Sequence, residues 1–281
     1  MHPPALIALD LDGTLLDSQK RITPRTLAAL EAAAARGIHI VPTTGRFFDG
    51  MPECVKALPF VRYAVTCNGA AVFDRVDNVV VAREELALDK ALAAIAVFER
   101  FDVIYDCYQD NWGWITASMV SKADDYTPNA FYARMMTELR TPVPELKAYL
   151  KEKGRDVQKV LSYARDPSVY ETMIPILKAE VPHVFVTMSN SKMLEVNAEN
   201  CHKGRALELL AAHLGFGMDR VMAFGDGLND LTMVRDSGMG VAMANAVPEV
   251  LAAAKIKTLS NDEDGVAAVI EKFLGASTEN I

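Results

Sequence analysis

Two carboxylates follow a hydrophobic stretch near the start of the chain. Asp10 and Asp12 come directly after the apolar run Ala5–Leu9, which is typical of a buried strand, and Gly13 follows as a turn residue. Side chains alternate along a strand, so residues two apart can point to the same side. The pair could act as a nucleophile and a general acid or base. It could equally form an Asp-Gly turn in which the aspartate only satisfies its own backbone.

A calcium-binding loop is a further alternative for two aspartates this close together. The EF-hand loop requires glycine at its sixth position, and counting from Asp10 that position is Leu15. The spacing therefore excludes an EF-hand. On these residues alone, a catalytic pair and a simple turn are equally good interpretations, and the rest of the chain must decide between them.

A second acidic loop follows the later apolar run Val221–Phe224. Residues 225–230 carry Asp226, Asn229 and Asp230, and either of the last two would also serve as the N-cap of a following helix. The two glycines of this loop are not followed by a third at position 230, so the dinucleotide-binding fingerprint is absent. The chain also contains no P-loop motif.

The four carboxylates suit a magnesium site if the two loops meet. Ligands of an open parallel sheet bind at the carboxyl ends of its strands, which is where both loops are expected to lie. Asp10, Asp12, Asp226 and Asp230 would then form an all-oxygen cluster, and hard oxygen ligands with positions left for water and phosphate suit Mg²⁺. Without a cation the carboxylates would repel one another and their pKa values would rise.

Two further positions could bind an anion beside this cluster. Lys203 opens a predicted helix, and Thr44 stands with Gly45 and Arg46 at the end of another apolar run. A lysine alone is usually an exposed surface residue, and Thr44 could simply form a turn with its own backbone. Next to a magnesium–carboxylate cluster, however, these groups offer a cation, a hydroxyl and backbone amides for a phosphate.

Strands alternate with helices in the first and last parts of the chain. Thr23 and Pro24 are typical of an N-cap and a first helical residue, and Gly37 ends that helix. This alternation predicts an α/β fold, a doubly wound parallel sheet covered by helices on both faces. The other elements expected in this part are strands 38–44, 62–67, 221–224 and 240–243 and helices 49–58, 204–214, 231–236, 248–254 and 264–274.

The middle of the chain has a different pattern. After a hairpin at 70–83, residues 84–197 contain helices and several strands around a variable segment, 118–144. This organisation predicts an inserted α/β domain of residues 84–197 within a core domain of residues 1–83 and 198–281.

Composition narrows the function classes. The chain of 281 residues is 51% hydrophobic, enough for a large core, and its net charge of −8 argues against binding nucleic acid or anionic lipid. Its four cysteines have no C-x-x-C spacing and are expected to be separate thiols. Neither a basic signal-peptide region nor a membrane span is visible, so we expect a cytoplasmic protein. The oligomeric state has no signal in the sequence.

The order of these motifs resembles the four motifs of the haloacid dehalogenase superfamily. The matching stretches are residues 10–15, 44–46, 203–204 and 225–230. The insertion between the second and third motifs, together with Asn68-Gly69-Ala70, resembles the Cof-type sugar-phosphatase branch. The residue before Lys203 is His202, where the superfamily usually has serine.

The resemblance implies Mg²⁺-dependent hydrolysis of a phosphate monoester through an aspartyl-phosphate. Asp10 would attack phosphorus, and Asp12 would protonate the leaving group and then activate the hydrolytic water. The metal-site residues would be Asp10, Asp12 through its backbone carbonyl, Asp226 and, behind them, Asp230. The residues that contact the substrate and its phosphoryl group would be Leu11, Thr44, Gly45, Arg46, Lys203 and Asn229.

The resemblance also implies a role for the inserted domain and a substrate class. The domain would act as a lid that excludes water and selects the leaving group. Small phosphorylated metabolites are the expected partners, with sugar phosphates first and nucleotide or pyridoxal phosphates after them. The alternatives are a phosphomutase on the same fold and a phosphosugar-binding protein without catalytic activity.

Overall fold

The chain divides into two compact units. The computed structural model describes residues 3–276, and its units are Met1–Arg83 with His202–Ile281 (the core unit) and Glu84–Cys201 (the inserted unit). The predicted insertion and the inserted unit begin at the same residue, and the unit extends four residues beyond the predicted end at 197. Each unit has its own hydrophobic core.

The core unit is built on a parallel sheet with the strand order β14-β13-β12-β1-β2. Its central strand β1 lies between β12 and β2, and Leu9 at its end is in register with Phe224 and Pro42. The residues that follow these three strands therefore meet at one edge of the sheet. The strands are β1 (Leu6–Leu9), β2 (His39–Pro42), β12 (Val221–Gly225), β13 (Met239–Ala242) and β14 (Ile256–Lys257).

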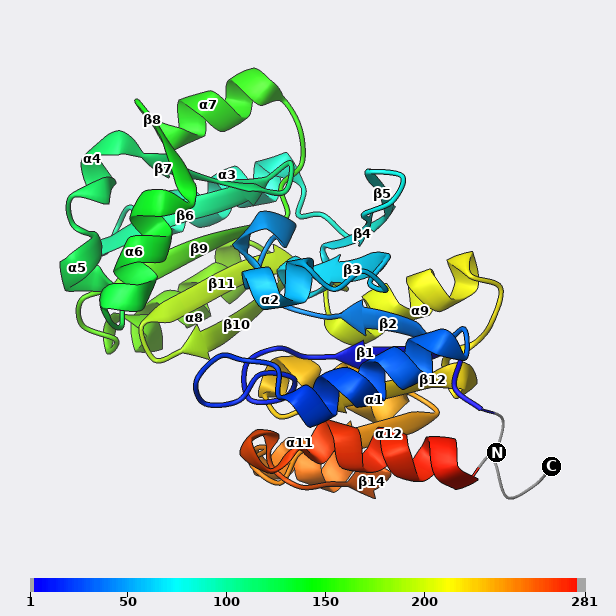
Figure 1. Cartoon of the computed structure of the whole chain (residues 1–281). Coiled ribbons are helices and arrows are strands. Elements are labelled where there is room, and N and C mark those ends of the chain that lie inside the picture. Colours follow the sequence, from blue (N-terminus) through cyan, green and yellow to red (C-terminus); the bar gives the residue numbers. More distant parts are fainter. Residues whose placement is uncertain (1–2, 277–281) are drawn as a thin grey trace. The chain divides into compact units, whose positions relative to one another are not determined.

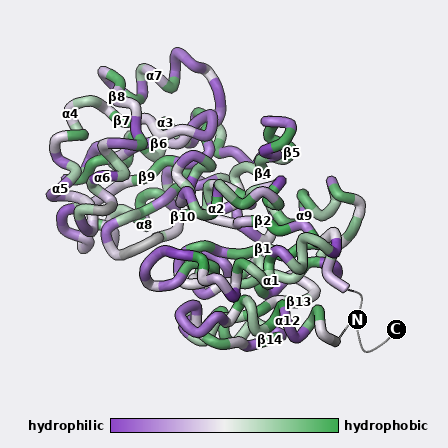
Figure 2. The backbone as a smooth tube through the Cα atoms, in the orientation of Figure 1, coloured by the Kyte–Doolittle hydropathy of each residue, from purple (hydrophilic) through white to green (hydrophobic). Residues whose placement is uncertain are grey.

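Helices cover both faces of this sheet because its strands are apolar on both sides (Figure 1). On β1, Ile7 and Leu9 pack with one pair of helices, whereas Leu6 and Ala8 pack with the opposite group. Figure 2 shows hydrophobic residues along β1 and hydrophilic residues in connecting loops. The predicted α/β class is confirmed. The first pair is α1 (Pro24–Ala35) and α12 (Gly265–Ala276), and the second group is α9 (Lys203–His213), α10 (Leu231–Asp236) and α11 (Pro248–Ala253).

Two predicted elements of the core unit differ from the structure. The single helix expected at 49–58 is a 3₁₀ turn, η1 (Phe48–Gly50), followed by the short helix α2 (Glu53–Lys56). Pro52 separates them, because the residue before a proline is disfavoured in helical conformation and Met51 is extended, with φ −73° and ψ 149°.

The strand expected at 62–67 does not continue the parallel sheet. This strand, β3 (Tyr63–Thr66), pairs antiparallel with β4 (Ala71–Asp74), which pairs in turn with β5 (Val79–Arg83) in a separate three-stranded sheet. The 3₁₀ turn η2 (Cys67–Gly69) folds the chain back, with Asn68 at φ 58° and Gly69 at φ 111°. A single parallel bridge between Thr43 and Val65 joins β3 to the end of β2.

The inserted unit has a six-stranded sheet with the order β10-β11-β9-β6-β7-β8. All neighbouring strands are antiparallel except β7 and β8, which are parallel. The segment 118–144, for which no elements were expected, contains three short helices and a strand. The elements are α3 (Leu88–Phe98), β6 (Val103–Gln109), β7 (Trp112–Thr116), α4 (Ala117–Val120), α5 (Ala123–Tyr126), α6 (Ala130–Glu138), β8 (Arg140–Val143), α7 (Leu146–Lys153), β9 (Lys159–Ala164), α8 (Val169–Glu180), β10 (Val184–Asn190) and β11 (Met193–Ala198).

No helix among residues 3–276 combines the length and the apolar character that a membrane crossing requires.

One face of the inserted sheet carries a buried ion pair. Arg140 Nε lies 2.5 Å from Asp106 Oδ2, and Arg140 Nη2 donates to the Tyr108 hydroxyl at 2.6 Å. Gly113 makes room for this side chain, because a Cβ at that position would stand 2.1 Å from Arg140 Cδ. Both charged side chains are almost completely buried, and Arg140 compensates the charge of Asp106 more than the nearby Lys159 does.

We expect Arg140→Met to destabilise folding by about 3–5 kcal/mol, because it removes the cation that contacts the buried Asp106 carboxylate, whose charge Lys159 compensates only in part. Urea unfolding monitored by circular dichroism measures this loss. In the double variant Asp106→Leu/Arg140→Met most of the loss should be recovered. The exposed pair Arg155–Asp110 supplies the matched control, and Arg155→Met should change stability little. An Arg140→Met protein as stable as the original would show that the pair is not needed for charge compensation.

Candidate active site

The side chain of Asp10 stands at the end of the central strand. Its backbone N–H donates to the Phe224 carbonyl at 3.1 Å, which continues the pairing of β1 with β12 by one residue. Its carboxylate is buried and accepts a hydrogen bond from Lys203 Nζ at 2.5 Å. Burial, together with the nearby charges of Asp230 and Asp226, raises the pKa of Asp10, and Lys203 opposes this shift.

Lys203 is a buried cation between two carboxylates. It is the first residue of α9, its side chain is completely buried, and Nζ lies 2.5 Å from Asp10 Oδ1 and 2.6 Å from Asp230 Oδ1. Burial alone would lower the pKa of Lys203, but the carboxylates of Asp10 and Asp230 outweigh it and raise that pKa. Lys203 is therefore protonated, and the interpretation as an exposed surface lysine is wrong.

Asp230 uses both of its carboxylate oxygens within the protein. Oδ1 accepts from Lys203, and Oδ2 accepts from the backbone N–H groups of Asp226 and Gly227, each at 2.9 Å. Gly225 permits this packing, because a Cβ there would stand 2.4 Å from the Asp230 Cβ. These contacts fix the conformation of the loop 225–230 and hold Lys203 in place. They favour a structural role for Asp230, behind the carboxylates of Asp10 and Asp226.

Asp226 faces the loop that follows β1. Thr14 Oγ1 donates to Asp226 Oδ1 at 2.8 Å. Gly13, at φ 88°, passes so close that a Cβ would lie 2.4 Å from Asp226 Oδ2. Burial is the main cause that raises the pKa of Asp226 to about 6.

These carboxylates fit a divalent metal ion. Asp10, Asp226 and Asp230 each offer a carboxylate oxygen, and these atoms lie within 4.8 Å of one another. All donors are hard oxygens, as Mg²⁺ prefers. Burial, followed by the charges of neighbouring carboxylates, raises the pKa values of Asp10 and Asp226. A divalent cation bound to these oxygens would favour the ionised form of both groups.

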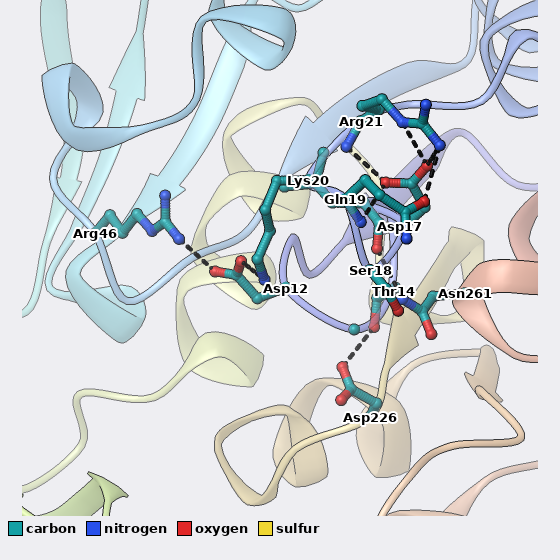
Figure 3. A network of polar contacts seen from close by, with 12 residues as sticks. Asp12, Thr14, Asp17, Ser18, Gln19, Lys20, Arg21, Arg46, Asp226 and Asn261 are labelled. Atoms are coloured by element: carbon teal, nitrogen blue, oxygen red, sulfur yellow. Dashed lines mark hydrogen bonds and ion pairs between the residues drawn. The ribbon is translucent and has the colours of Figure 1, made fainter. Parts of the chain in front are cut away.

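Asp12 lies between two cations (Figure 3). Lys20 Nζ contacts Asp12 Oδ1 at 2.6 Å, and Arg46 Nη2 contacts Asp12 Oδ2 at 2.6 Å. Partial burial raises the pKa of Asp12, but Arg46 and Lys20 outweigh it and the net shift is downward. Asp10 and Asp12 are thus held by different cations although only one residue separates them.

The second predicted motif lies beside a buried asparagine. The Thr44 hydroxyl accepts from the Arg46 N–H at 3.2 Å, which is the turn that the sequence left open as an alternative. The Thr44 carbonyl accepts from the Asn68 N–H at 3.0 Å, and Asn229 Nδ2 donates to Asn68 Oδ1 at 3.2 Å. A Cβ on Gly45 would stand 3.0 Å from the same Asn68 oxygen. Asn68 therefore joins the second and fourth motifs.

Leu11 contributes differently from the other predicted residues. Its side chain is fully buried in the hydrophobic core, so only its backbone could contact a phosphoryl group. Three residues of this site were not predicted: Thr14, Lys20 and Asn68. The signal for Asn68 was the stretch Asn68-Gly69-Ala70, which was used for the family resemblance and not as part of the site.

A comparison with protein families gives a match over most of the chain. The model of the family described as haloacid dehalogenase-like hydrolase matches residues 7–270 of this chain. The matched range includes the whole inserted unit, most of the core unit and every predicted site residue.

Similar proteins include two phosphatases. The 5-amino-6-(5-phospho-D-ribitylamino)uracil phosphatase YcsE of Bacillus subtilis is 30% identical over 269 residues, which are 96% of this chain and 95% of that protein. The HMP-PP phosphatase of Serratia proteamaculans is 30% identical over 247 residues, 87% of this chain and 85% of that protein.

A solved structure with a similar fold is that of the HAD subclass IIB sugar phosphatase BT4131. It superposes with a TM-score of 0.77 at 25% sequence identity, and the match covers 95% of this chain and 98% of that one.

Proposed function

Because the chain belongs to the haloacid dehalogenase-like hydrolase family, we propose that it is a Mg²⁺-dependent phosphatase of small phosphorylated metabolites that acts through an aspartyl-phosphate on Asp10. The observation that carries this proposal is the buried Lys203, whose ammonium group bridges Asp10 and Asp230 beside Asp226. A buried cation among carboxylates at the ends of adjacent parallel strands suits the binding of a phosphoryl group.

The metal would be held by Asp10, Asp226 and the backbone carbonyl of Asp12. Bound there, Mg²⁺ neutralises charge on the phosphoryl oxygens and helps to orient the ester. The side chains of Asp10, Asp12, Asp226 and Asp230 carry four negative charges when ionised, and Lys203, Arg46 and Lys20 carry three positive charges. A divalent cation makes the site positive overall, which favours a phosphate dianion.

Asp10 is the nucleophile in this proposal. Lys203 contacts Asp10 Oδ1, which leaves the other carboxylate oxygen to attack phosphorus. Asp12 gives a proton to the leaving oxygen and later accepts one from the water that cleaves the aspartyl-phosphate. Phosphoryl oxygens would be bound by the Lys203 ammonium and the Asn229 amide, and also by the Thr44 hydroxyl with the backbone around Gly45 and Leu11. Arg46 would contact the substrate.

Sugar phosphates are the substrates that we propose first. The subclass IIB sugar phosphatase named above supports this choice, and the two similar phosphatases named above have other substrates in their names. We propose that the inserted unit selects the leaving group. The cytoplasmic location expected from the sequence stays a prediction.

A phosphomutase and a non-catalytic phosphosugar-binding protein are the alternatives. Steady-state hydrolysis of p-nitrophenyl phosphate with Mg²⁺, compared with EDTA, separates them from a phosphatase. Metal-dependent release of phosphate supports the proposal, and a panel of sugar phosphates then ranks the natural esters. A folded protein that binds Mg²⁺ but releases no phosphate from any ester of the panel would contradict it.

We expect Mg²⁺ to raise the melting temperature by several degrees, because it binds the folded carboxylate cluster and not the unfolded chain. Differential scanning calorimetry with Mg²⁺ and with EDTA measures the shift. The shift should disappear in Asp226→Asn and persist in Asp262→Asn, which changes an exposed carboxylate outside the cluster. An equal shift in both variants would place the ion elsewhere.

A further inference from the structure

We propose that His202 is a positioning residue whose imidazole caps the N-terminus of α9 and thereby sets the place of the Lys203 ammonium group. This inference rests on the proposed phosphatase function, in which Lys203 binds a phosphoryl oxygen. His202 directly precedes Lys203, at the position where the superfamily usually has serine. This chain therefore has an aromatic ring where a hydroxyl group is usual.

The imidazole of His202 accepts a hydrogen bond from the first turn of α9. The backbone of His202 is extended, with φ −150° and ψ 157°, and its Nδ1 accepts from the Arg205 N–H at 3.0 Å. Serine and asparagine make the same kind of bond as N-caps, and it satisfies a backbone donor that has no partner within the helix. A ring nitrogen that accepts such a bond carries no proton, so the cap requires an unprotonated Nδ1.

Other contacts hold the same turn from neighbouring parts of the core unit. The Gly204 N–H donates to Thr232 Oγ1 of α10 at 3.1 Å, and the His202 carbonyl accepts from the Ala206 N–H at 3.2 Å. Gly69 lies against that carbonyl, because a Cβ on Gly69 would stand 2.5 Å from the His202 oxygen. The start of α9 is therefore held by α10 and by the turn at Gly69, and the imidazole closes the first turn itself.

The position of this turn matters because Lys203 is its first residue. The side chain of Lys203 is completely buried, and Nζ lies 2.5 Å from Asp10 Oδ1 and 2.6 Å from Asp230 Oδ1. A side chain packed in this way has little room to compensate for a shift of its own backbone. A change at the start of α9 therefore moves the ammonium group relative to the carboxylates, and misplacing a catalytic group by about 1 Å can cost about a hundredfold in rate.

Substitutions at His202 can separate the hydrogen bond from the shape of the side chain. His202→Asn places an amide oxygen on Cγ, where histidine has Nδ1, and asparagine is a good N-cap. His202→Leu keeps a branch at Cγ but has no acceptor. His202→Ala also lacks the acceptor and is a smaller change, so it serves as a second variant without the cap.

The test measures kcat for p-nitrophenyl phosphate with saturating Mg²⁺, on protein that circular dichroism shows to be folded. We expect kcat to fall about tenfold or more in His202→Leu and in His202→Ala, and less than about twofold in His202→Asn. The recovery by asparagine follows because its side chain accepts the same N–H. A His202→Asn protein as slow as His202→Leu would overturn the role of the cap.

Thr23→Ala is the matched control, because Thr23 is the N-cap of α1, a helix that carries no residue of the site. Differential scanning calorimetry should show a lower melting temperature for Thr23→Ala and for His202→Leu, since each loses a helix cap. Only His202→Leu should lose kcat. A cap that served folding alone would lower the melting temperature in both variants and leave kcat unchanged in both, which would overturn the proposal.

A double variant shows whether His202 acts through Lys203. The ammonium group is absent in Lys203→Met, so adding His202→Leu to that variant should lower kcat further by less than about twofold. Equal losses in the wild-type and Lys203→Met backgrounds would overturn the positioning role while the phosphatase function stands. A wild-type protein that releases no phosphate with Mg²⁺ would overturn the proposed function and this inference together.

Discussion

Asp10→Asn abolishes turnover in our account, with a loss of at least about a thousandfold in kcat. The amide of asparagine is neutral and a poor nucleophile, so no acyl phosphate forms on residue 10. Asparagine has nearly the same shape as aspartate, and it removes one charge from a cluster in which burial and neighbouring carboxylates raise the pKa of Asp10. We therefore expect the folded structure to persist and the melting temperature in EDTA to stay the same or rise.

Hydrolysis of p-nitrophenyl phosphate with Mg²⁺ measures the loss of turnover. Circular dichroism measures whether the variant keeps its folded structure and its melting temperature. Asp77→Asn, which changes an exposed carboxylate paired with Arg62, is the control and should keep full activity. Substantial turnover by a purified, folded Asp10→Asn protein would contradict the assignment of Asp10 as the nucleophile.

Lys203→Met should affect both stability and activity. It leaves the carboxylates of Asp10 and Asp230 buried without their cation, and loss of one partner of a buried ion pair typically costs about 3–5 kcal/mol of folding free energy. Urea unfolding in EDTA measures this cost, and Mg²⁺ should reduce it by supplying positive charge. We also expect kcat to fall by at least about a hundredfold, because a donor for the phosphoryl oxygens is lost.

A double variant separates the two effects of Lys203. In Lys203→Met/Asp230→Asn one stranded charge is removed, so stability should return in large part while activity stays low. Lys255→Met is the matched control, since the ammonium group of that lysine donates to the backbone carbonyls of Ser237 and Gly238, and it should leave kcat unchanged. A Lys203→Met protein with unchanged kcat would contradict the role of Lys203 in catalysis.

Much of the core fold could be predicted because local signals and tertiary packing agree there. Thr23 accepts from the Thr26 N–H as the N-cap of α1, and Pro24 is the first residue of that helix, as the sequence indicated. Hydrophobic periodicity led to a wrong prediction where another effect determined the local structure. Pro52 divided an expected helix, and the turn at Asn68 gave β3 an antiparallel neighbour in place of a parallel one. The membership of the haloacid dehalogenase superfamily, predicted from motif order, is confirmed.

The site was predictable where strand ends carry unusual residues and unpredictable where it depends on distant contacts. Asp10, Asp226 and Asp230 share one edge of the sheet because their strands are in register. Asn68 contacts Asn229 across 161 residues of sequence, and nothing near Asn68 indicates that contact. The contact between Lys20 and Asp12, eight residues earlier, likewise depends on the turn between them and could not be predicted from the sequence.

The most direct test of the central claim is to locate the phosphoryl group on the protein during turnover. The reaction with p-nitrophenyl phosphate and Mg²⁺ is quenched in acid, and mass spectrometry identifies the phosphorylated peptide. We predict one phosphoryl group on Asp10 in the wild-type protein and none in Asp10→Asn. Turnover with the phosphoryl group on another residue, or with no phosphoenzyme in a quench fast enough to resolve one turnover, would contradict the account.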